Sequence, residues 1–297
     1  MSISRNQFDV LTYLERRENV FTQRELAECL KKALGTVNKA MMELNELGLV
    51  NGGKITTAGY AALEPYRVKR AIFIAAGFGT RLIPITLNTP KPLVRVNGQR
   101  IIDSLLDAVT AVGIEEIYIV RGYLSEQFDQ LLYKYPNIKF IENPAYNEAN
   151  NISSVMCARN LLQNAYVFEA DLLLSNPELV TKYQYATNYL GVPTAQTEDW
   201  CFFTNGRQIV KMAIGGKNCH HMFGISYWTE QDGERLSGCV ENVYEQPGGK
   251  ERYWDQVALE YYIKEFKVEV RECVFSDIAE IDTYRELKQI DPAYNEI

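Results

Sequence analysis

The spacing of apolar residues along this chain changes near residue 66. Up to that point they recur every three or four positions, which is typical of amphipathic helices. From Lys69 onward, short apolar runs that are typical of buried strands alternate with amphipathic helical stretches. We therefore expect a small domain at residues 1–66 and a larger one at residues 67–297.

The first domain is expected to contain helices followed by a short hairpin. Thr22 and Glu25 have the spacing of a capping box, and Gly48 is placed to end a second helix over residues 36–47. A turn at Gly52-Gly53 then joins two short strands. This order resembles the winged helix-turn-helix domains of bacterial regulators, with residues 36–47 as the candidate recognition helix.

Residues 1–66 carry as many acidic side chains as basic ones, so this domain has no marked positive charge. DNA-binding domains usually have one, because neutralisation of phosphates dominates their affinity. Lys31, Lys32 and Lys39 would supply a modest basic patch. DNA therefore stays open as a partner of residues 1–66, and packing within a homodimer is the alternative use of the same shape.

The second domain is expected to be an α/β fold. Predicted strands and helices alternate over residues 71–76, 101–112, 116–120, 125–133, 138–141, 151–162 and 166–170. Such alternation predicts a mixed, mostly parallel, Rossmann-like sheet with helices on both faces. Ligands of these folds bind beyond the carboxyl ends of the strands, where Gly77, Gly122, Asn151 and Asp171 fall.

Composition excludes several classes of protein. No apolar stretch approaches the roughly 20 residues that span a bilayer, and residues 1–13 lack the basic start and apolar block of a signal peptide. Six scattered cysteines without a Cys-x-x-Cys motif argue against a disulfide framework and a zinc site. We therefore expect a cytoplasmic protein without a membrane partner, whose thiols are reduced.

A glycine loop follows the first predicted strand of the large domain. Gly77 and Gly79 allow backbone amides to approach an anion, and Arg81 and Lys91 add positive charge nearby. The spacing fits neither the dinucleotide-binding fingerprint nor a P-loop, because a third glycine and a Gly-Lys-Ser/Thr are missing. This combination suits a nucleoside triphosphate.

Two aspartates are candidate metal ligands. Asp171 ends an apolar strand, and Asp282 follows a short apolar-acidic segment before a predicted helix at residues 283–290. Mg2+ prefers oxygen ligands and usually takes one or two carboxylates together with substrate phosphates. Either acid alone would be interpreted as a helix cap or a loop aspartate, but beside the glycine loop the pair becomes a candidate metal site.

The full loop pattern resembles a known signature. It reads Ala75-Ala76-Gly77-x-Gly79-Thr80-Arg81-x-x-Pro84 and continues with Pro90-Lys91-Pro92-Leu93, as in sugar-phosphate and choline-phosphate nucleotidyltransferases. Over residues 69–291 the chain resembles bacterial CTP:phosphocholine cytidylyltransferases. Further matching segments are Gly122-Tyr123-Leu124, Asn150-Asn151, Asp171, Tyr253-Trp254-Asp255 and Glu280-Ile281-Asp282.

This resemblance implies a nucleotidyltransferase fold, CTP and phosphocholine as substrates, Mg2+ as cofactor, and CDP-choline and pyrophosphate as products. It implies that Lys91 stabilises the α-phosphate and that Arg81 holds the outer phosphates. The nucleotide-binding residues would be Ala75, Ala76, Gly77, Gly79, Thr80, Gly122, Tyr123, Asn151 and Ser153.

Aromatic residues of the C-terminal half are candidates for the acceptor pocket. A quaternary ammonium donates no N–H hydrogen bond, so proteins hold it with aromatic faces and carboxylates. The candidates are Trp200, Trp228, Trp254, Asp255 and Glu280. Trp228 lies in an apolar run and Trp254 opens a candidate helix, so either is also compatible with the core.

Alternative functions remain open on these residues. Phosphoethanolamine or 2-aminoethylphosphonate would fit much of the same pocket, and a sugar 1-phosphate is the acceptor used elsewhere in the wider family. A transcription regulator whose larger domain senses a nucleotide is the alternative of a different class. The combination of Arg81, Lys91, Asp171 and Asp282 favours an active enzyme.

Overall fold

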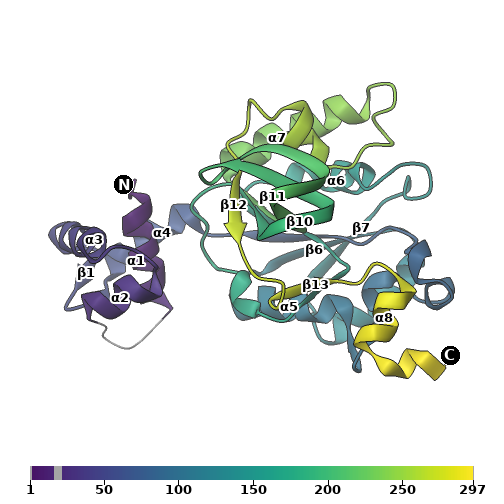
Figure 1. Ribbon diagram of the computed structural model, residues 1–297, viewed down its shortest axis with the longest axis horizontal. Coiled ribbons are helices and arrows are strands. Elements are labelled where there is room, and N and C mark those ends of the chain that lie inside the picture. The colour runs from purple at the N-terminus through teal and green to yellow at the C-terminus, as the bar shows by residue number, and fades with distance from the viewer. Residues whose placement is uncertain (1, 17–21, 297) are drawn as a thin grey trace. The chain divides into compact units, whose positions relative to one another are not determined.

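A computed structural model describes residues 2–16 and 22–296 of the chain (Figure 1). Its contacts divide the chain into two compact units. The first contains Met1–Arg67 together with the short segment Tyr183–Tyr185. The second contains Val68–Lys182 and Ala186–Ile297. Among the described residues, no helix has both the length and the apolar character needed to cross a membrane.

The first unit is mostly helical. Its elements are α1 (Arg5–Glu15), α2 (Gln23–Cys29), α3 (Leu34–Glu46), β1 (Val50–Asn51), β2 (Lys54–Ile55), α4 (Thr57–Leu63) and a 3-10 turn at Glu64–Tyr66. The two short strands pair antiparallel. Helical faces meet in an apolar core in which Leu11, Val37 and Leu44 are fully buried, because their spacing places them on the inner sides of α1 and α3.

The residues predicted to begin and end helices in this unit are confirmed. The Thr22 side chain accepts from the Glu25 amide and the Glu25 side chain accepts from the Thr22 amide, so the capping box forms. Gly48 follows α3 with a φ of +69°, a conformation that glycine adopts readily. The helix predicted at residues 36–47 begins two residues earlier, at Leu34. The winged-helix assignment, DNA binding and a homodimer stay predictions.

The second unit is built on a seven-stranded mixed sheet. The strands are β3 (Arg70–Ile74), β6 (Glu116–Arg121), β7 (Ile138–Glu142), β8 (Ala165–Glu169), β10 (Asn188–Asn205), β11 (Gln208–Trp228) and β12 (Glu269–Glu272), in the order β10-β12-β11-β8-β3-β6-β7. The four strands β8, β3, β6 and β7 are parallel to one another, whereas β11 runs antiparallel to β8 and forms a long hairpin with β10. Two small two-stranded sheets, β4 (Arg95–Val96) with β5 (Gln99–Arg100) and β9 (Leu172–Leu174) with β13 (Ile278–Glu280), flank it. The predicted α/β fold with a mixed, mostly parallel sheet is confirmed.

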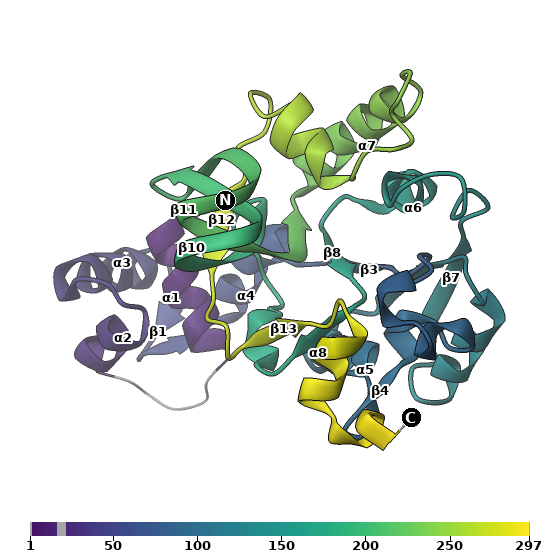
Figure 2. The same ribbon diagram turned by 45° about the vertical axis from the view of Figure 1, so that its right-hand side comes forward.

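Helices cover both faces of the sheet, as predicted (Figures 1 and 2). On one face α5 (Ile101–Ala111) and the 3-10 helix at Ser125–Tyr133 bury their apolar sides against β3 and β6. On the other face α6 (Ile152–Ala158), α7 (Glu230–Tyr244) and a π-helical turn at Val257–Tyr261 cover β8 and β11. The last helix, α8 (Tyr284–Ile290), follows β13 and lies beside α5 (Figure 2).

Two predicted helices differ in detail. The stretch at residues 125–133 is a 3-10 helix, and the helix predicted over residues 151–162 becomes α6 followed by a 3-10 turn at Arg159–Leu161. Hydrophobic spacing indicates which face of a segment is buried, but over about three turns it does not separate α from 3-10 geometry.

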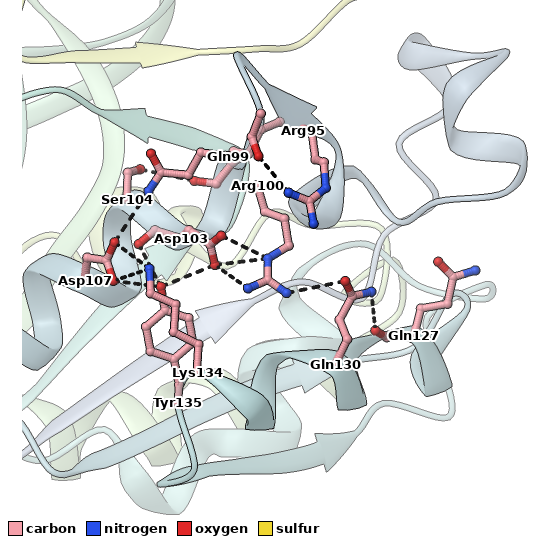
Figure 3. Close-up of polar contacts among 12 residues, drawn as sticks. Arg95, Gln99, Arg100, Asp103, Ser104, Asp107, Gln127, Gln130, Lys134 and Tyr135 are labelled. Atoms are coloured by element: carbon pink, nitrogen blue, oxygen red, sulfur yellow. Dashed lines mark hydrogen bonds and ion pairs between the residues drawn. The ribbon is translucent and has the colours of Figure 1, made fainter.

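A polar network ties α5 to the segment at residues 125–135 (Figure 3). The buried Arg100 guanidinium pairs with the buried Asp103 carboxylate and also donates to Gln130 Oε1 at 3.4 Å. Tyr135 donates its hydroxyl to Asp107 Oδ1 at 2.8 Å. Because a buried charge is stabilised only when it is paired, this network holds the two elements in one arrangement.

Candidate active site

A cavity of about 340 Å³ lies at the carboxyl ends of β3 and β8. Its lining includes the glycine loop after β3, the carboxylates after β8 and side chains from the β10–β11 hairpin. The expected site residues that line it are Ala75, Gly77, Gly79, Arg81, Lys91, Asn151, Asp171, Trp200, Asp255, Glu280 and Asp282. Residues that are far apart in the sequence therefore meet around one cavity, at the sheet edge where ligands of α/β folds bind.

Lys91 lies between two carboxylates at the centre of this site. Its Nζ atom is 2.7 Å from Asp171 Oδ2 and 2.8 Å from Asp282 Oδ1, and only 10% of the lysine side chain is exposed. Burial by itself would lower the pKa of this ammonium, but the attraction of Asp171 and Asp282 outweighs it and the pKa is raised. Lys91 is therefore a fixed positive charge at neutral pH.

Strand pairing and apolar packing bring Lys91, Asp171 and Asp282 together. Asp171 directly precedes β9 and Asp282 follows β13 by two residues, and the two strands pair antiparallel with Glu280 opposite Leu172. An apolar cluster then joins Leu82 and Val94, which flank the Arg81 and Lys91 positions, to Ile281 and Leu287 of the C-terminal segment. The C-terminal segment thus completes a site that begins two hundred residues earlier in the chain.

Arg81 extends the positive charge toward the solvent. Its Nη2 atom is 2.9 Å from Asp282 Oδ1, and 66% of its side chain is exposed. Arg81 shares Asp282 with Lys91, but unlike Lys91 it is held on one side only. The arginine is therefore placed to reach an anion at the mouth of the cavity, while the lysine acts deeper inside it.

The glycine loop is packed closely against Lys91. Gly79 has a φ of +63°, and a Cβ atom there would lie 2.9 Å from the Cβ of Lys91 and 3.1 Å from Cγ2 of Thr86. The buried Thr86 hydroxyl donates to the Gly79 carbonyl at 2.8 Å. This position needs glycine for two separate reasons, the left-handed backbone and the lack of space.

Three carboxylates gather on one wall of the cavity. Oxygens of Glu169, Asp171 and Glu280 lie within 4.8 Å of one another, and Asp171 Oδ1 is buried without a hydrogen-bond partner among the described residues. Burial is the main cause that raises the pKa of Glu169, and the nearby Asp255 adds to the rise. Burial also raises the pKa of Glu280, to about 9, and Asp171 is the acid that contributes most to this rise. A cation that enters the cavity would relieve this repulsion.

Asn151 and Gly224 hold the Glu169 carboxylate in place. Asn151 Nδ2 donates to Glu169 Oε1 at 3.3 Å, and Asn151 Oδ1 accepts from the Trp254 amide at 2.9 Å. A Cβ atom on Gly224 would lie 2.5 Å from Glu169 Oε2, so the carboxylate packs directly on the backbone of β11. Asn151 therefore connects the end of β8 with the segment that carries Tyr253 and Asp255.

Another part of the cavity lining combines aromatic and acidic side chains. The rings of Trp200 and Tyr253 meet edge to face with centroids 5.7 Å apart, and both residues line the cavity. Asp255 is buried, and its Oδ1 atom accepts the Tyr189 hydroxyl at 2.7 Å. Burial raises the pKa of Asp255 to about 7, although the hydrogen bond from Tyr189 opposes the rise.

Comparisons with known proteins agree with this geometry. The family model described as Nucleotidyl transferase matches residues 70–193. A 2-aminoethylphosphonate cytidylyltransferase of Lancefieldella rimae is 36% identical over 228 residues, which cover 75% of this chain and 92% of that protein. The choline-phosphate cytidylyltransferase of Streptococcus pneumoniae is 32% identical over 225 residues, covering 74% and 97%. The chain belongs to the nucleotidyltransferase family.

Solved structures share the architecture of this nucleotidyltransferase. The CTP:phosphocholine cytidylyltransferase from Streptococcus pneumoniae superposes with a TM-score of 0.70 at 31% identity, covering 76% of this chain and 99% of that one. The inositol-1-phosphate CTP transferase from T. maritima gives a TM-score of 0.60 at 17% identity, covering 75% and 96%, and shows the common fold.

Two of the three tryptophans expected in the acceptor pocket of this nucleotidyltransferase lie in its core. Trp228 is 0% and Trp254 is 1% exposed, and their rings pack edge to face with centroids 6.1 Å apart. Trp228 ends β11 and sits opposite Ala165 of β8, on the face that α6 and α7 cover. The expectation that Trp228 and Trp254 bind the acceptor is corrected in favour of the core alternative, because burial of their large apolar surfaces stabilises the fold.

Several residues expected to bind the nucleotide do not line the cavity. Ser153 is buried, donates its hydroxyl to the Asn150 carbonyl at 2.8 Å and accepts from Asn143 at 2.9 Å. The Tyr123 hydroxyl donates to the Thr86 carbonyl at 2.9 Å. The remaining residues of this group, which also lie outside the lining, are Ala76, Thr80 and Gly122.

Sequence reasoning missed three residues of this nucleotidyltransferase site: Glu169, Tyr189 and Gly224. Glu169 had a readable signal, because it is a second acid at the end of the same apolar run, two residues before Asp171. The other two carried no local signal. Tyr189 resembles any aromatic strand residue, and Gly224 matters only because Glu169 packs on it.

Proposed function

We propose that this nucleotidyltransferase is a cytidylyltransferase that transfers CMP from CTP to phosphocholine, giving CDP-choline and pyrophosphate. The observation that carries the proposal is the Lys91 ammonium held between Asp171 and Asp282 beneath the glycine loop. The choice of CTP is supported by the cytidylyltransferases from Lancefieldella rimae and Streptococcus pneumoniae, which match over most of their own length.

The proposed reaction joins two anions. An oxygen of the acceptor phosphate attacks the α-phosphorus of CTP, the new P–O bond forms, and the bond to the β-phosphate oxygen breaks to release pyrophosphate. The attacking oxygen is already ionised at neutral pH, so no general base is needed. Catalysis then depends on placing the reactants and stabilising the charge that develops. Lys91 would serve the α-phosphate, and Arg81 would hold the departing phosphates.

Asp171 and Asp282 are the proposed ligands of Mg2+. Both carboxylates already face one cationic group, the Lys91 ammonium, and Asp171 Oδ1 is buried without a hydrogen-bond partner among the described residues. Oxygen donors of this kind are those that Mg2+ prefers. When bound, the ion would neutralise phosphate charge.

The acceptor end of the cavity fits a molecule with an ammonium group. Trp200 and Tyr253 offer aromatic surface, and Glu169, Asp255 and Glu280 offer carboxyl groups whose raised pKa values a bound ammonium group would lower. A second candidate acceptor, 2-aminoethylphosphonate, is favoured by the burial of Trp228 and Trp254. The three acids can accept hydrogen bonds from a primary ammonium group. The two aromatic groups can contact a quaternary ammonium.

An acceptor series tests the proposed function. Purified protein with Mg2+ and each of the four nucleoside triphosphates is incubated with phosphocholine, phosphoethanolamine, 2-aminoethylphosphonate or glucose 1-phosphate, and released pyrophosphate is measured. We expect turnover with CTP and an ammonium-bearing acceptor, and none with glucose 1-phosphate. Turnover with the sugar phosphate alone would contradict the proposal, and faster turnover with 2-aminoethylphosphonate than with phosphocholine would select the second acceptor.

The contact between Gly79 and Lys91 leads to a separate prediction. Gly79→Ala places a methyl group 2.9 Å from Lys91 Cβ, so we expect kcat to fall by about 10²-fold, because small misplacements of a reacting group cost rates of that order. Gly98→Ala is the matched control, since Gly98 also has a positive φ, +85°, but a methyl group there would have no atom of the described residues within 4 Å. Both variants should lose about 1 to 2 kcal/mol of stability. Equal losses of kcat in the two would show that backbone strain, and not Lys91 placement, is responsible.

A further inference from the structure

A buried tyrosine outside the cavity lining contacts the acidic end of the site. Tyr189 of β10 is 0% exposed, and its hydroxyl is 2.7 Å from Asp255 Oδ1. Asp255 lines the cavity, whereas Tyr189 lies behind the lining. Among the described residues, Asp255 is the cavity-lining residue to which the Tyr189 hydroxyl donates.

Three aromatic rings pack against the Tyr189 ring. It stacks on Trp254 with centroids 5.9 Å apart, and it meets Trp228 and Phe202 edge to face at 6.0 and 5.6 Å. Protein interiors of this kind are closely packed, so the hydroxyl is held at one point relative to β10. Trp228 and Trp254, although they do not face the acceptor, thus fix the donor that orients Asp255.

A second contact holds the same segment from the other side. The amide of Trp254, the residue before Asp255, donates to Asn151 Oδ1 at 2.9 Å. Asn151 and Tyr189 come from different elements, the start of α6 and β10, and clamp the backbone and the side chain of one short segment. Such support from two directions is what keeps a binding carboxylate in a single orientation.

We propose that Tyr189 is a positioning residue that sets the acceptor specificity of the enzyme, by holding the Asp255 carboxylate toward the ammonium group of the acceptor. This inference rests on the proposed function, because it assigns the partner of Asp255 within the acceptor pocket. Tyr189 donates to Oδ1 of Asp255, and in this proposal the ammonium group contacts the same carboxylate from the cavity that Asp255 lines. Burial makes this arrangement worth more than a surface contact, because charge-assisted hydrogen bonds strengthen where water is excluded.

The variant Tyr189→Phe removes the hydroxyl and keeps the ring. We expect the KM for the acceptor to rise about tenfold, because a hydrogen bond to a charged group is worth about that factor, with kcat and the KM for CTP within about twofold of the parent. The matched control is Tyr227→Phe. Tyr227 is also buried, on the neighbouring strand β11, and its hydroxyl donates to Asn164 at 3.2 Å, away from the cavity lining.

A neutral acceptor separates positioning from general loosening of the fold. In 3,3-dimethylbutyl phosphate a carbon atom replaces the nitrogen of phosphocholine, and propylphosphonate does the same for 2-aminoethylphosphonate. Tyr189→Phe should leave kcat/KM for the neutral analogue within about twofold, since Asp255 has no charge to bind there. An equal rise of KM for charged and neutral acceptors would overturn the proposal. The double variant with Asp255→Asn should show no additional effect of Tyr189→Phe.

The outcomes distinguish the two proposals. Absence of CMP transfer by the parent protein overturns the proposed function, and the role of Tyr189 with it. Turnover by the parent with an unchanged acceptor KM in folded Tyr189→Phe overturns only the role of Tyr189. Should Tyr189→Phe fail to fold, Asp255→Glu keeps the charge and displaces the carboxylate from the tyrosine, and an unchanged acceptor KM in that variant would equally refute the positioning role.

Discussion

Replacement of Lys91 by alanine is expected to lower kcat for CMP transfer by about 10³-fold, the largest effect of any single change in this site. The ammonium lies 2.7 and 2.8 Å from two carboxylates in a mostly buried position, so no solvent cation replaces it in the same geometry. The KM for CTP should change much less, because Arg81 and the backbone of the glycine loop remain. Steady-state pyrophosphate release measures both constants.

Lys139→Ala is the control for the loss of a lysine. Lys139 is exposed on β7, away from the cavity lining, and its replacement should leave kcat within about twofold, as surface substitutions of this kind usually do. Thermal unfolding of both variants shows whether they are folded. A folded Lys91→Ala protein that forms product as quickly as the parent would contradict the proposed mechanism.

The second large effect is expected for Asp171→Asn. The substitution keeps the size of the side chain but removes the negative charge that faces Lys91 and, in the proposed mechanism, Mg2+. We expect kcat to fall by about 10²-fold or more and the Mg2+ concentration for half-maximal rate to rise, because a neutral amide is a weaker ligand for a hard cation. Removal of Mg2+ with EDTA should abolish turnover in the parent, and added Mg2+ should restore it.

Asp129→Asn serves as the matched control for Asp171. Asp129 is an exposed acid that pairs with Arg121 outside the cavity lining, so its replacement should change neither the rate nor the Mg2+ dependence. A normal Mg2+ titration in folded Asp171→Asn would refute the assignment of Asp171 as a ligand. It would direct attention to the neighbouring carboxylates of Glu169 and Glu280.

Much of the fold was readable from local patterns. The capping box at Thr22 and the glycine after α3 were visible because each depends on a few consecutive residues. The parallel strands β3, β6, β7 and β8 were visible because each is a short apolar run between amphipathic stretches. The long β10–β11 hairpin was not, since much of its length is exposed and carries polar residues that hide a strand pattern.

Some residues of the candidate site could likewise be predicted from the sequence, and others could not. Gly77, Gly79, Arg81 and Lys91 lie within one short stretch, so their chemistry could be recognised from spacing alone. The tryptophans could not be sorted, because an indole ring suits a core and a cation pocket equally well until its neighbours are known. Only Trp200 reaches the cavity, and Trp228 and Trp254 instead pack around Tyr189.

Local sequence thus sufficed for the strand-and-helix alternation and for the phosphate-binding chemistry of the glycine loop, because backbone geometry and side-chain charge act over a few residues. The folded chain alone placed Asp282 beside Lys91 and Tyr189 behind Asp255, pairs that are 191 and 66 residues apart. Such pairings depend on how β9 meets β13 and how β10 packs over the segment after α7. No short-range periodicity encodes that packing, which is set by the burial of apolar surface over the whole domain.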